Sequence, residues 1–438
     1  MAKHRVDPFG GFRPSDEDGF QDVVIDELCS ALFWSLPRSD QRHKGAEYVR
    51  GLLLAEGRKS IRNIAAAAGG RCTEQNLHHF ICSSTWDWTP IRAALARYAV
   101  RVATPLAWVV RTTVIPKAGE HSVGVERTFI PSMGQVFNAQ RAFGVWASAD
   151  NLSIPVNWRL QLSKAWLDDP ARRTQASIPV DHVPETVSDC VVETFAELVA
   201  AEPTLPVRPV VLDARELDVL RVVRGLRAAG APPLVRVEGT LPLRPVAHQV
   251  KPRLPAPSGF ARPAAGRPVG VVPAGQLVAE IRNLRRPVTW SDPAAGGAAR
   301  TSLVAATTVR LPGQAVRGRA AAGAAGPGSS GAGLAGLAPV AAHGDEMMLL
   351  AAGPRDRRWP TELWLTDLTD LDPVVVFRLS RLTDQVDRYF APIADEVGLR
   401  DFAGRSYGGW HRHVTLSSVA QAVAALTDAA QRRSCYAC

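Results

Sequence analysis

The sequence lacks an apolar run long enough to cross a membrane. Its first residues, MAKHRVDPFGGFRP, hold no apolar stretch of the kind that serves as a secretory signal. Both absences favour a cytoplasmic protein without a membrane partner. The chain is 438 residues long and 46% hydrophobic, which is ample for a buried core and suggests two or three domains.

Cysteine is scarce: there are six in the chain, and only Cys435 and Cys438, in the terminal CYAC, lie close together in sequence. One such pair supplies two thiolates, whereas a structural zinc site usually needs four ligands. Thiols of a cytosolic protein stay reduced. We therefore expect neither a zinc site nor a disulfide framework, and we interpret the pair as part of a frayed terminus.

Acidic residues are fewer than basic ones, with Asp+Glu at 42 against Lys+Arg at 51, so the formal net charge is +9 and the pI is about 9.6. This excess suits a polyanionic partner, because each phosphate contact releases counterions. GC-rich coding offers another explanation, since the chain also holds 35 glycines and 33 prolines.

Residues 17–105 are predicted to be helical, because apolar residues recur at helical spacing. Within them, Ser60 to Ala68 forms a short apolar segment, a Gly-Gly turn follows, and Thr73 can cap a second helix. Helix, tight turn, helix is the outline of a helix-turn-helix. Basic residues that could contact DNA phosphates lie beside it: Arg58, Lys59, Arg62 and Arg71. An ordinary helical hairpin inside a bundle is the alternative.

From residue 106 the pattern changes to β-branched runs with short turns, which predict an antiparallel meander. The meander is followed by an amphipathic helix, the strand RPVVLDARE, a helix ending at Gly230 and the strand PPLVRVEG. This is the order of an RNase H-like core. Residues 241–355 break it with a Pro-, Gly-, Ala- and Arg-rich insertion that contains a small β part and a low-complexity loop, and residues 290–345 stay unassigned. The core resumes over residues 356–430.

Four segments carry a resemblance to a known family. They are EYVRGLLLAEGRKSIRNIA, AGEHSVGVERTFIPSMGQVFNAQRAFGVWASAD, WRLQLSKAWLDDPARRTQASIP and GLRDFAGRSYGGWHRHVTL. In this order they resemble bacterial insertion-sequence transposases of the DDE superfamily. The resemblance implies an α/β, RNase H-like fold with an N-terminal helical domain, and an endonuclease or strand transferase that acts on double-stranded DNA. It also implies a triad of acids that holds two Mg²⁺ ions, since Mg²⁺ prefers carboxylates and water.

The triad carries over incompletely. In VVRTTVIPKAGEHSVGV, Arg111 stands where the family has its first acid. Asp213 in VVLDARE matches the second, and Asp387 in DQVDRYF falls on the position of the third, a glutamate. A guanidinium cannot be deprotonated in proteins, so it opposes a metal ion where a carboxylate should bridge two. The resemblance therefore implies a degenerate site, with Mg²⁺ as cofactor if the protein is active and none otherwise.

Other interpretations stay open. Asp213 could cap the helix that begins near Leu217, and Asp387 could pair with an arginine on its own helix. Glu120 or Glu126 could replace the missing acid. His411 and His413 in GWHRH are interpreted as contacts to phosphate or as core residues.

We predict a nucleoid-associated DNA-binding protein with impaired or lost strand cleavage, with a homodimer as an open alternative. An active transposase with a displaced carboxylate, and a transposase-derived regulatory or interaction protein, are the alternatives.

Overall fold

The computed structural model describes residues 17–70, 72–130, 134–246, 270–292, 297–312, 345–356 and 359–436. The chain divides into two compact units. The first unit comprises Met1–Pro206 and Asp384–Cys438, and the second comprises Val207–Thr383. None of the described helices is long and apolar enough to span a membrane.

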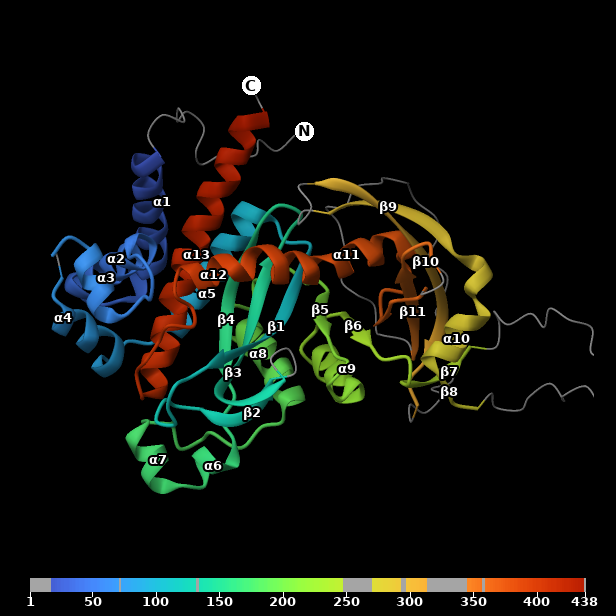
Figure 1. Cartoon of the computed structure of the whole chain (residues 1–438), viewed down its shortest axis with the longest axis horizontal. Helices are drawn as coiled ribbons and strands as arrows, with labels where there is room; N and C mark the ends of the chain where they lie inside the picture. The colour runs from blue at the N-terminus through green and yellow to red at the C-terminus, as the bar shows by residue number, and fades with distance from the viewer. Residues whose placement is uncertain are drawn as a thin grey trace, which may run out of the picture. The chain divides into compact units, whose positions relative to one another are not determined.

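The first unit opens with a group of helices that pack with the C-terminal helix (Figure 1). They are α1 (Glu17–Leu32), η1 (Phe33–Ser35), α2 (Ser39–Leu54), α3 (Ile61–Ala67), α4 (Glu74–His78), the π-helical η2 (His79–Ser83) and α5 (Thr89–Ala103). The C-terminal helix, α13 (Tyr407–Tyr436), contacts α1, α2 and β4, and its residues 409–423 are all buried. It is therefore a central core helix rather than a surface helix.

The predicted helix, turn and helix are confirmed. The side chain of Ser60 caps α3 by accepting from the backbone of Asn63, and Thr73 caps α4 in the same way. Gly69 and Gly70 link the two helices with φ angles of +69° and +74°, a conformation that other residues rarely adopt.

An antiparallel sheet forms the other half of the first unit. Its strands are β1 (Ala107–Pro116), β2 (Glu126–Ile130), β3 (Gln135–Ser148) and β4 (Ser153–Leu160). β3 pairs with all of the others: β2 along its first residues, and β1 and β4 along the rest. The meander predicted from the sequence is confirmed, including the turn at Gly134, which has a φ of +63°.

Five further helices complete the described part of the first unit. α6 (Lys164–Leu167), α7 (Pro170–Gln175) and α8 (Val187–Ala201) follow β4, and η5 (Val386–Phe390) and α12 (Ala391–Glu396) precede α13. α8 begins at a capping box between Thr186 and Asp189. It contacts β3 and β4, as does α5. These contacts bury one face of the sheet against helices.

The second unit is built around a mixed sheet. β5 (Val210–Asp213) and β6 (Pro233–Val237) are parallel and joined by α9 (Val219–Ala228). β6 is followed across the sheet by β12 (Glu362–Thr366), β11 (Glu346–Gly353) and β10 (Ala298–Arg310), all antiparallel. The remaining elements are β7 (Pro242–Pro245), β8 (Val272–Pro273), α10 (Ala274–Glu280), η3 (Arg282–Leu284), β9 (Arg286–Asp292) and α11 (Pro373–Gln385).

The three domains predicted from the sequence stay a prediction. In the structure, α13 packs against both α1 and β4 and so joins the helices of residues 17–105 to the sheet. The described parts of the predicted insertion, residues 241–355, are more regular than expected. They contribute β9, β10 and β11 to the same sheet as β5 and β6. Residues 247–269 and 313–344 lie outside the described residues.

Candidate functional site

Arg111 stands in the middle of β1, opposite Gly144 of β3. Residues two apart in a strand point to the same face. The Arg111 side chain accordingly reaches Thr113, and its Nη1 donates to Thr113 Oγ1 over 2.8 Å. Thr113 is buried and the Arg111 side chain is 20% exposed. The guanidinium is thus held in a fixed place at the surface of the sheet.

Asp387 lies next to it. The residue belongs to the π-helical segment η5, where its neighbours Val386 and Phe390 are buried and its own side chain is 56% exposed. Arg111 Nε donates to Asp387 Oδ1 over 2.5 Å. The position predicted for the first acid and the position predicted for the third acid are therefore in contact, but they form an ion pair instead of a pair of carboxylates.

A further carboxylate, which the sequence reasoning missed, is influenced by the charge of Arg111. Asp395 on α12 pairs with Arg400, with 2.8 Å between Asp395 Oδ1 and Arg400 Nε. Burial raises the pKa of Asp395 above its usual value, although the charges of Arg400 and Arg111 act in the opposite direction. Asp395 follows Asp387 by eight residues, close to two helical turns, and this spacing is the signal that could have found it.

Asp213 ends β5 in the second unit, and arginines hold it as well. Arg215 donates to both of its carboxylate oxygens, with distances from 2.6 to 3.1 Å, and Arg236 lies 3.9 Å away. Burial raises the pKa of Asp213, but the hydrogen bonds and charge of Arg215, with the charge of Arg236, outweigh it and leave the pKa below its usual value. The cap of α9 is Asp218, so Asp213 is not the cap of that helix.

These residues do not suit a divalent metal pair. Among the described residues, no group of three or more His, Cys, Asp or Glu side chains is arranged to hold a metal ion. Mg²⁺ takes oxygen ligands in octahedral geometry, and β1 offers a guanidinium and threonines instead. Two unit charges of the same sign about 4 Å apart repel by roughly 4 kcal/mol at an effective dielectric of 20, which opposes a metal ion beside Arg111.

The residues predicted to contact DNA near α3 differ in accessibility. Arg58 and Arg62 are exposed. Lys59 is buried: its ammonium donates to the Ala55 carbonyl, its backbone N–H donates to Asp401 Oδ2 over 2.7 Å, and burial lowers its pKa. A phosphate cannot reach Lys59 in this conformation. Arg71 lies outside the described residues.

His411 and His413 are core residues, buried to 3% and 1% exposure. His413 Nε2 donates to the Gly398 carbonyl over 2.8 Å, so its Nδ1 accepts from the Tyr48 hydroxyl over 2.9 Å. His411 stacks on Trp88 with ring centroids 4.6 Å apart. Neither ring reaches a surface, so of the two interpretations offered for them, contact with phosphate or packing, the structure supports packing.

His411 also borders a buried arginine. The guanidinium of Arg92 donates to Thr415 Oγ1, to Asn157 Oδ1 and to the Trp158 carbonyl, over 2.7 to 3.0 Å, and to the Nδ1 of His411 over 3.1 Å. Burial lowers the pKa of Arg92 to about 10. This hydrogen-bonded group joins α5, β4 and α13.

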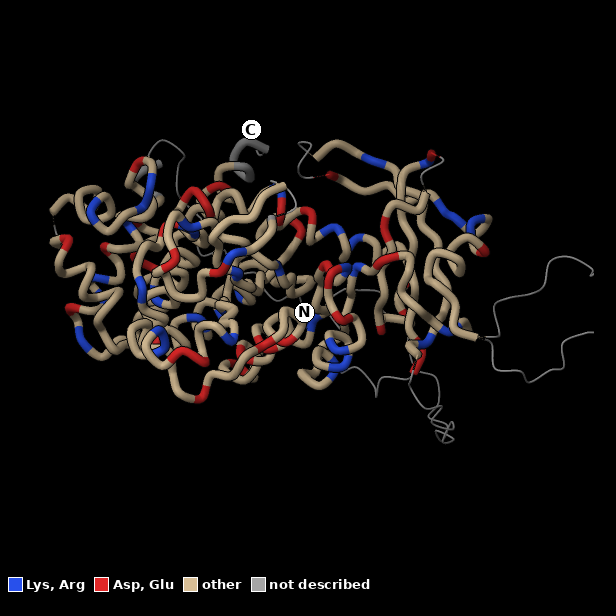
Figure 2. Tube along the Cα trace, turned by 60° about the horizontal axis from the view of Figure 1, so that its bottom comes forward, with Lys and Arg blue, Asp and Glu red and all other residues tan. Residues whose placement is uncertain are grey.

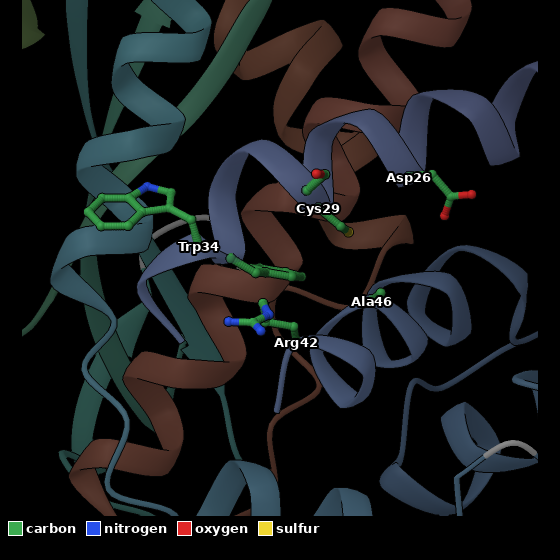
Figure 3. Close-up of a pocket in the computed structure, with 7 residues that line it drawn as sticks. Asp26, Cys29, Trp34, Arg42 and Ala46 are labelled. Atoms are coloured by element: carbon green, nitrogen blue, oxygen red, sulfur yellow. The ribbon is translucent and has the colours of Figure 1, made fainter. Parts of the chain in front are cut away.

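A pocket of about 540 Å³ opens between α1 and α2 (Figure 3). It is lined by Asp26, Cys29, Ser30, Phe33, Trp34, Arg42 and Ala46. Trp34 is 64% exposed, and Arg42 is held by a bond of 2.7 Å from its Nη1 to the Leu36 carbonyl. The pocket does not include any residue of the Arg111 site.

The comparison with protein families identifies the class. A family model described as DDE superfamily endonuclease matches residues 31–317, more than half of the chain. The chain therefore belongs to the DDE superfamily of endonucleases. The match covers both Arg111 and Asp213 and ends before Asp387. No curated protein matches the chain.

Proposed function

We propose that this chain is a DNA-binding, transposase-like member of the DDE superfamily, of insertion-sequence origin, in which strand cleavage is impaired or lost. The Arg111–Asp387 ion pair is the observation that carries the proposal. Asp213 and Asp387 are the remnants of the triad in this account, and an RNase H-like core is the fold that the strand order supports.

The ion pair bears on catalysis in two ways. Arg111 places a permanent positive charge where the family has a metal ligand. It also takes up Asp387, so that carboxylate is no longer free to bind a cation. DNA binding needs neither acid, because it depends on cations that meet phosphates. Loss of the metal site therefore leaves DNA binding intact.

Arg58, just before α3, and Arg62, on α3, are exposed cations that we assign to DNA, with Arg71 as a further prediction. Figure 2 shows acidic and basic residues interspersed along the trace of each unit rather than gathered by sign. We therefore expect small groups of arginines such as Arg58 and Arg62, and not one continuous basic face, to contact the DNA phosphates. We make no assignment for Lys59, His411 and His413, because they are buried.

A second candidate function, an active transposase with a displaced carboxylate, finds support in one residue. Asp395 lies near enough to Arg111 for the arginine's charge to affect its pKa. Glu120 is exposed in the turn after β1, and Glu126 starts β2. Asp395 is therefore the better candidate for a replacement acid.

The proposed function is tested by electrophoretic retardation of duplex DNA at low salt, once with Mg²⁺ and once with EDTA. We expect equal retardation under both conditions, because the contacts are made by arginines and not through a metal. Retardation that requires a divalent metal, or no retardation of any duplex, would contradict the proposal.

A further inference from the structure

The outer part of the β2–β3 hairpin is a two-stranded ribbon. β2 pairs with residues 135–139 of β3, whereas β1 pairs with β3 only from Ala139 onward. One more backbone bond, from Lys117 N–H to the Asn138 carbonyl, extends the contact with the β1 segment by a single residue. Gln135 to Phe137 therefore have β2 as their strand neighbour within the described chain, and the ribbon extends past the end of β1.

One face of this ribbon combines two polar and two apolar side chains. In the register, Arg127 is opposite Asn138 and Phe129 is opposite Val136, and positions two apart share a face. Phe129 is 58% exposed and Val136 is 51% exposed, and Arg127 is exposed as well. Within the described residues, the side chains of Arg127 and Asn138 form no hydrogen bond or ion pair with the rest of the protein. Their donors are available to a ligand.

The other face differs in charge. Glu126 is opposite Ala139 and so lies on the face away from Arg127. Burial raises the pKa of Glu126, and the charge of Arg141 lowers it. The face with Phe129 and Val136 thus carries a cation and no carboxylate of the ribbon, which favours an anionic partner.

The base of the ribbon is fixed to its surroundings. Trp166 Nε1 on α6 donates to the Val125 carbonyl over 3.0 Å, immediately before β2 begins. Arg172 of α7 lies over the same indole, 5.4 Å from its centroid. Lys164, on α6, is exposed and adds a second cation near this end of the ribbon. A fixed base allows the ribbon to present its side chains in one orientation.

We propose that this face of the β2–β3 ribbon reads base edges in the major groove of duplex DNA. The major groove of B-DNA admits a two-stranded β-ribbon. Arginine donates two hydrogen bonds to guanine, asparagine pairs with adenine, and apolar side chains contact the methyl group of thymine. Arg127, Asn138 and the Phe129–Val136 pair supply these three kinds of contact on one face. The inference rests on the proposed function, since it assigns sequence recognition to a protein proposed to bind DNA.

The test begins with a pool of duplexes whose central segment is randomised. Full-length protein is used to select bound sequences, and the affinity of each variant is then measured on the enriched duplex and on a scrambled duplex. The variants are Arg127→Ala and Asn138→Ala. Gln135→Ala is the matched control, because Gln135 is exposed on the opposite face of the same ribbon.

We expect Arg127→Ala and Asn138→Ala each to lose about tenfold to a hundredfold in affinity for the enriched duplex. Their affinity for the scrambled duplex should change little, and Gln135→Ala should behave as the wild type. Arg127 and Gln135 are exposed and Asn138 is half-buried, and unchanged thermal unfolding of the variants confirms that they are folded.

Four outcomes would overturn the inference. If both variants bind the enriched duplex like the wild type, the ribbon does not read it, while the proposed function stands. If they lose affinity equally for both duplexes, Arg127 contacts phosphate only. If sedimentation shows a wild-type dimer that Phe129→Ser dissociates, with DNA affinity unchanged, the face is a contact between two copies. Failure of the wild type to bind any duplex removes the proposed function together with this inference.

Discussion

At the scale of single residues, the chemistry of the candidate site depends on Arg111. Its guanidinium donates hydrogen bonds to Asp387 and Thr113, so it neutralises one acid and excludes a cation from the place beside it. We predict that Arg111→Asp will gain measurable binding of Mn²⁺ in calorimetric titration. The substitution removes the repulsion and frees Asp387 as a ligand, and strand cleavage need not return with it.

The control for this substitution is Arg111→Leu. It removes the positive charge without adding a carboxylate, and we expect it to bind Mn²⁺ more weakly than Arg111→Asp. Equal Mn²⁺ binding by the wild type and by Arg111→Asp would contradict the assignment of Arg111 to the first-acid position.

At the scale of elements, α13 shows how buried polar residues can fix one packing. His413 on this helix has both ring nitrogens bonded in its neutral form. Burial lowers its pKa to about 4, an effect that the Gly398 carbonyl partly opposes. The folded pKa is thus below the unfolded value, so the stability from neutral His413 is present above about pH 6.5 and is lost as the pH falls toward 4.

We therefore predict that the free energy of unfolding will fall by about 3 kcal/mol between neutral pH and pH near 4 because of His413. The pKa of buried His411 is lowered too, which adds to the fall. Denaturant unfolding at a series of pH values between neutral and about 4 measures this free energy. His413→Gln should weaken the dependence of the free energy of unfolding on pH, whereas His43→Gln, at an exposed histidine of α2, should not. Identical slopes for the wild type and His413→Gln would refute this account.

The elements also show what the sequence could and could not predict. Local sequence signals were sufficient to predict the caps at Ser60 and Thr73 and the turn at Gly134, because local hydrogen bonds and the conformation of glycine determine these features. The meander followed from β-branched alternation. The accessibility of Lys59 could not be predicted, since a segment more than 300 residues away covers it, with Asp401 as its partner.

The site was predicted in the same uneven way. Family motifs located Arg111 and Asp387, and the structure brings them together. The role of Asp395 depends on the fold around α12: no family motif includes it, and its spacing from Asp387 is the signal that the sequence offers. That Asp213 forms one triad with the positions of Arg111 and Asp387, as the family resemblance implies, stays a prediction.

At the scale of the whole molecule, the net charge of +9 bears on DNA affinity. We predict that binding of duplex DNA will weaken steeply with salt, with a slope that reports the number of phosphates contacted. The double substitution Arg58→Ala and Arg62→Ala should reduce that slope by about two. Arg101→Ala, at an exposed arginine of α5, serves as the control. A slope unaffected by the double substitution would place the DNA away from α3.

The loss of strand cleavage is tested by a nicking assay on supercoiled plasmid that carries the DNA flanking the coding sequence. The wild type is compared with Asp213→Ala and Asp395→Ala, each with Mg²⁺ or Mn²⁺. We expect no nicked product above the protein-free control for any of the three proteins, because Arg111 opposes the metal and forms an ion pair with Asp387. Metal-dependent nicking by the wild type that disappears in Asp213→Ala would contradict this expectation, and its loss in Asp395→Ala as well would identify the replacement acid.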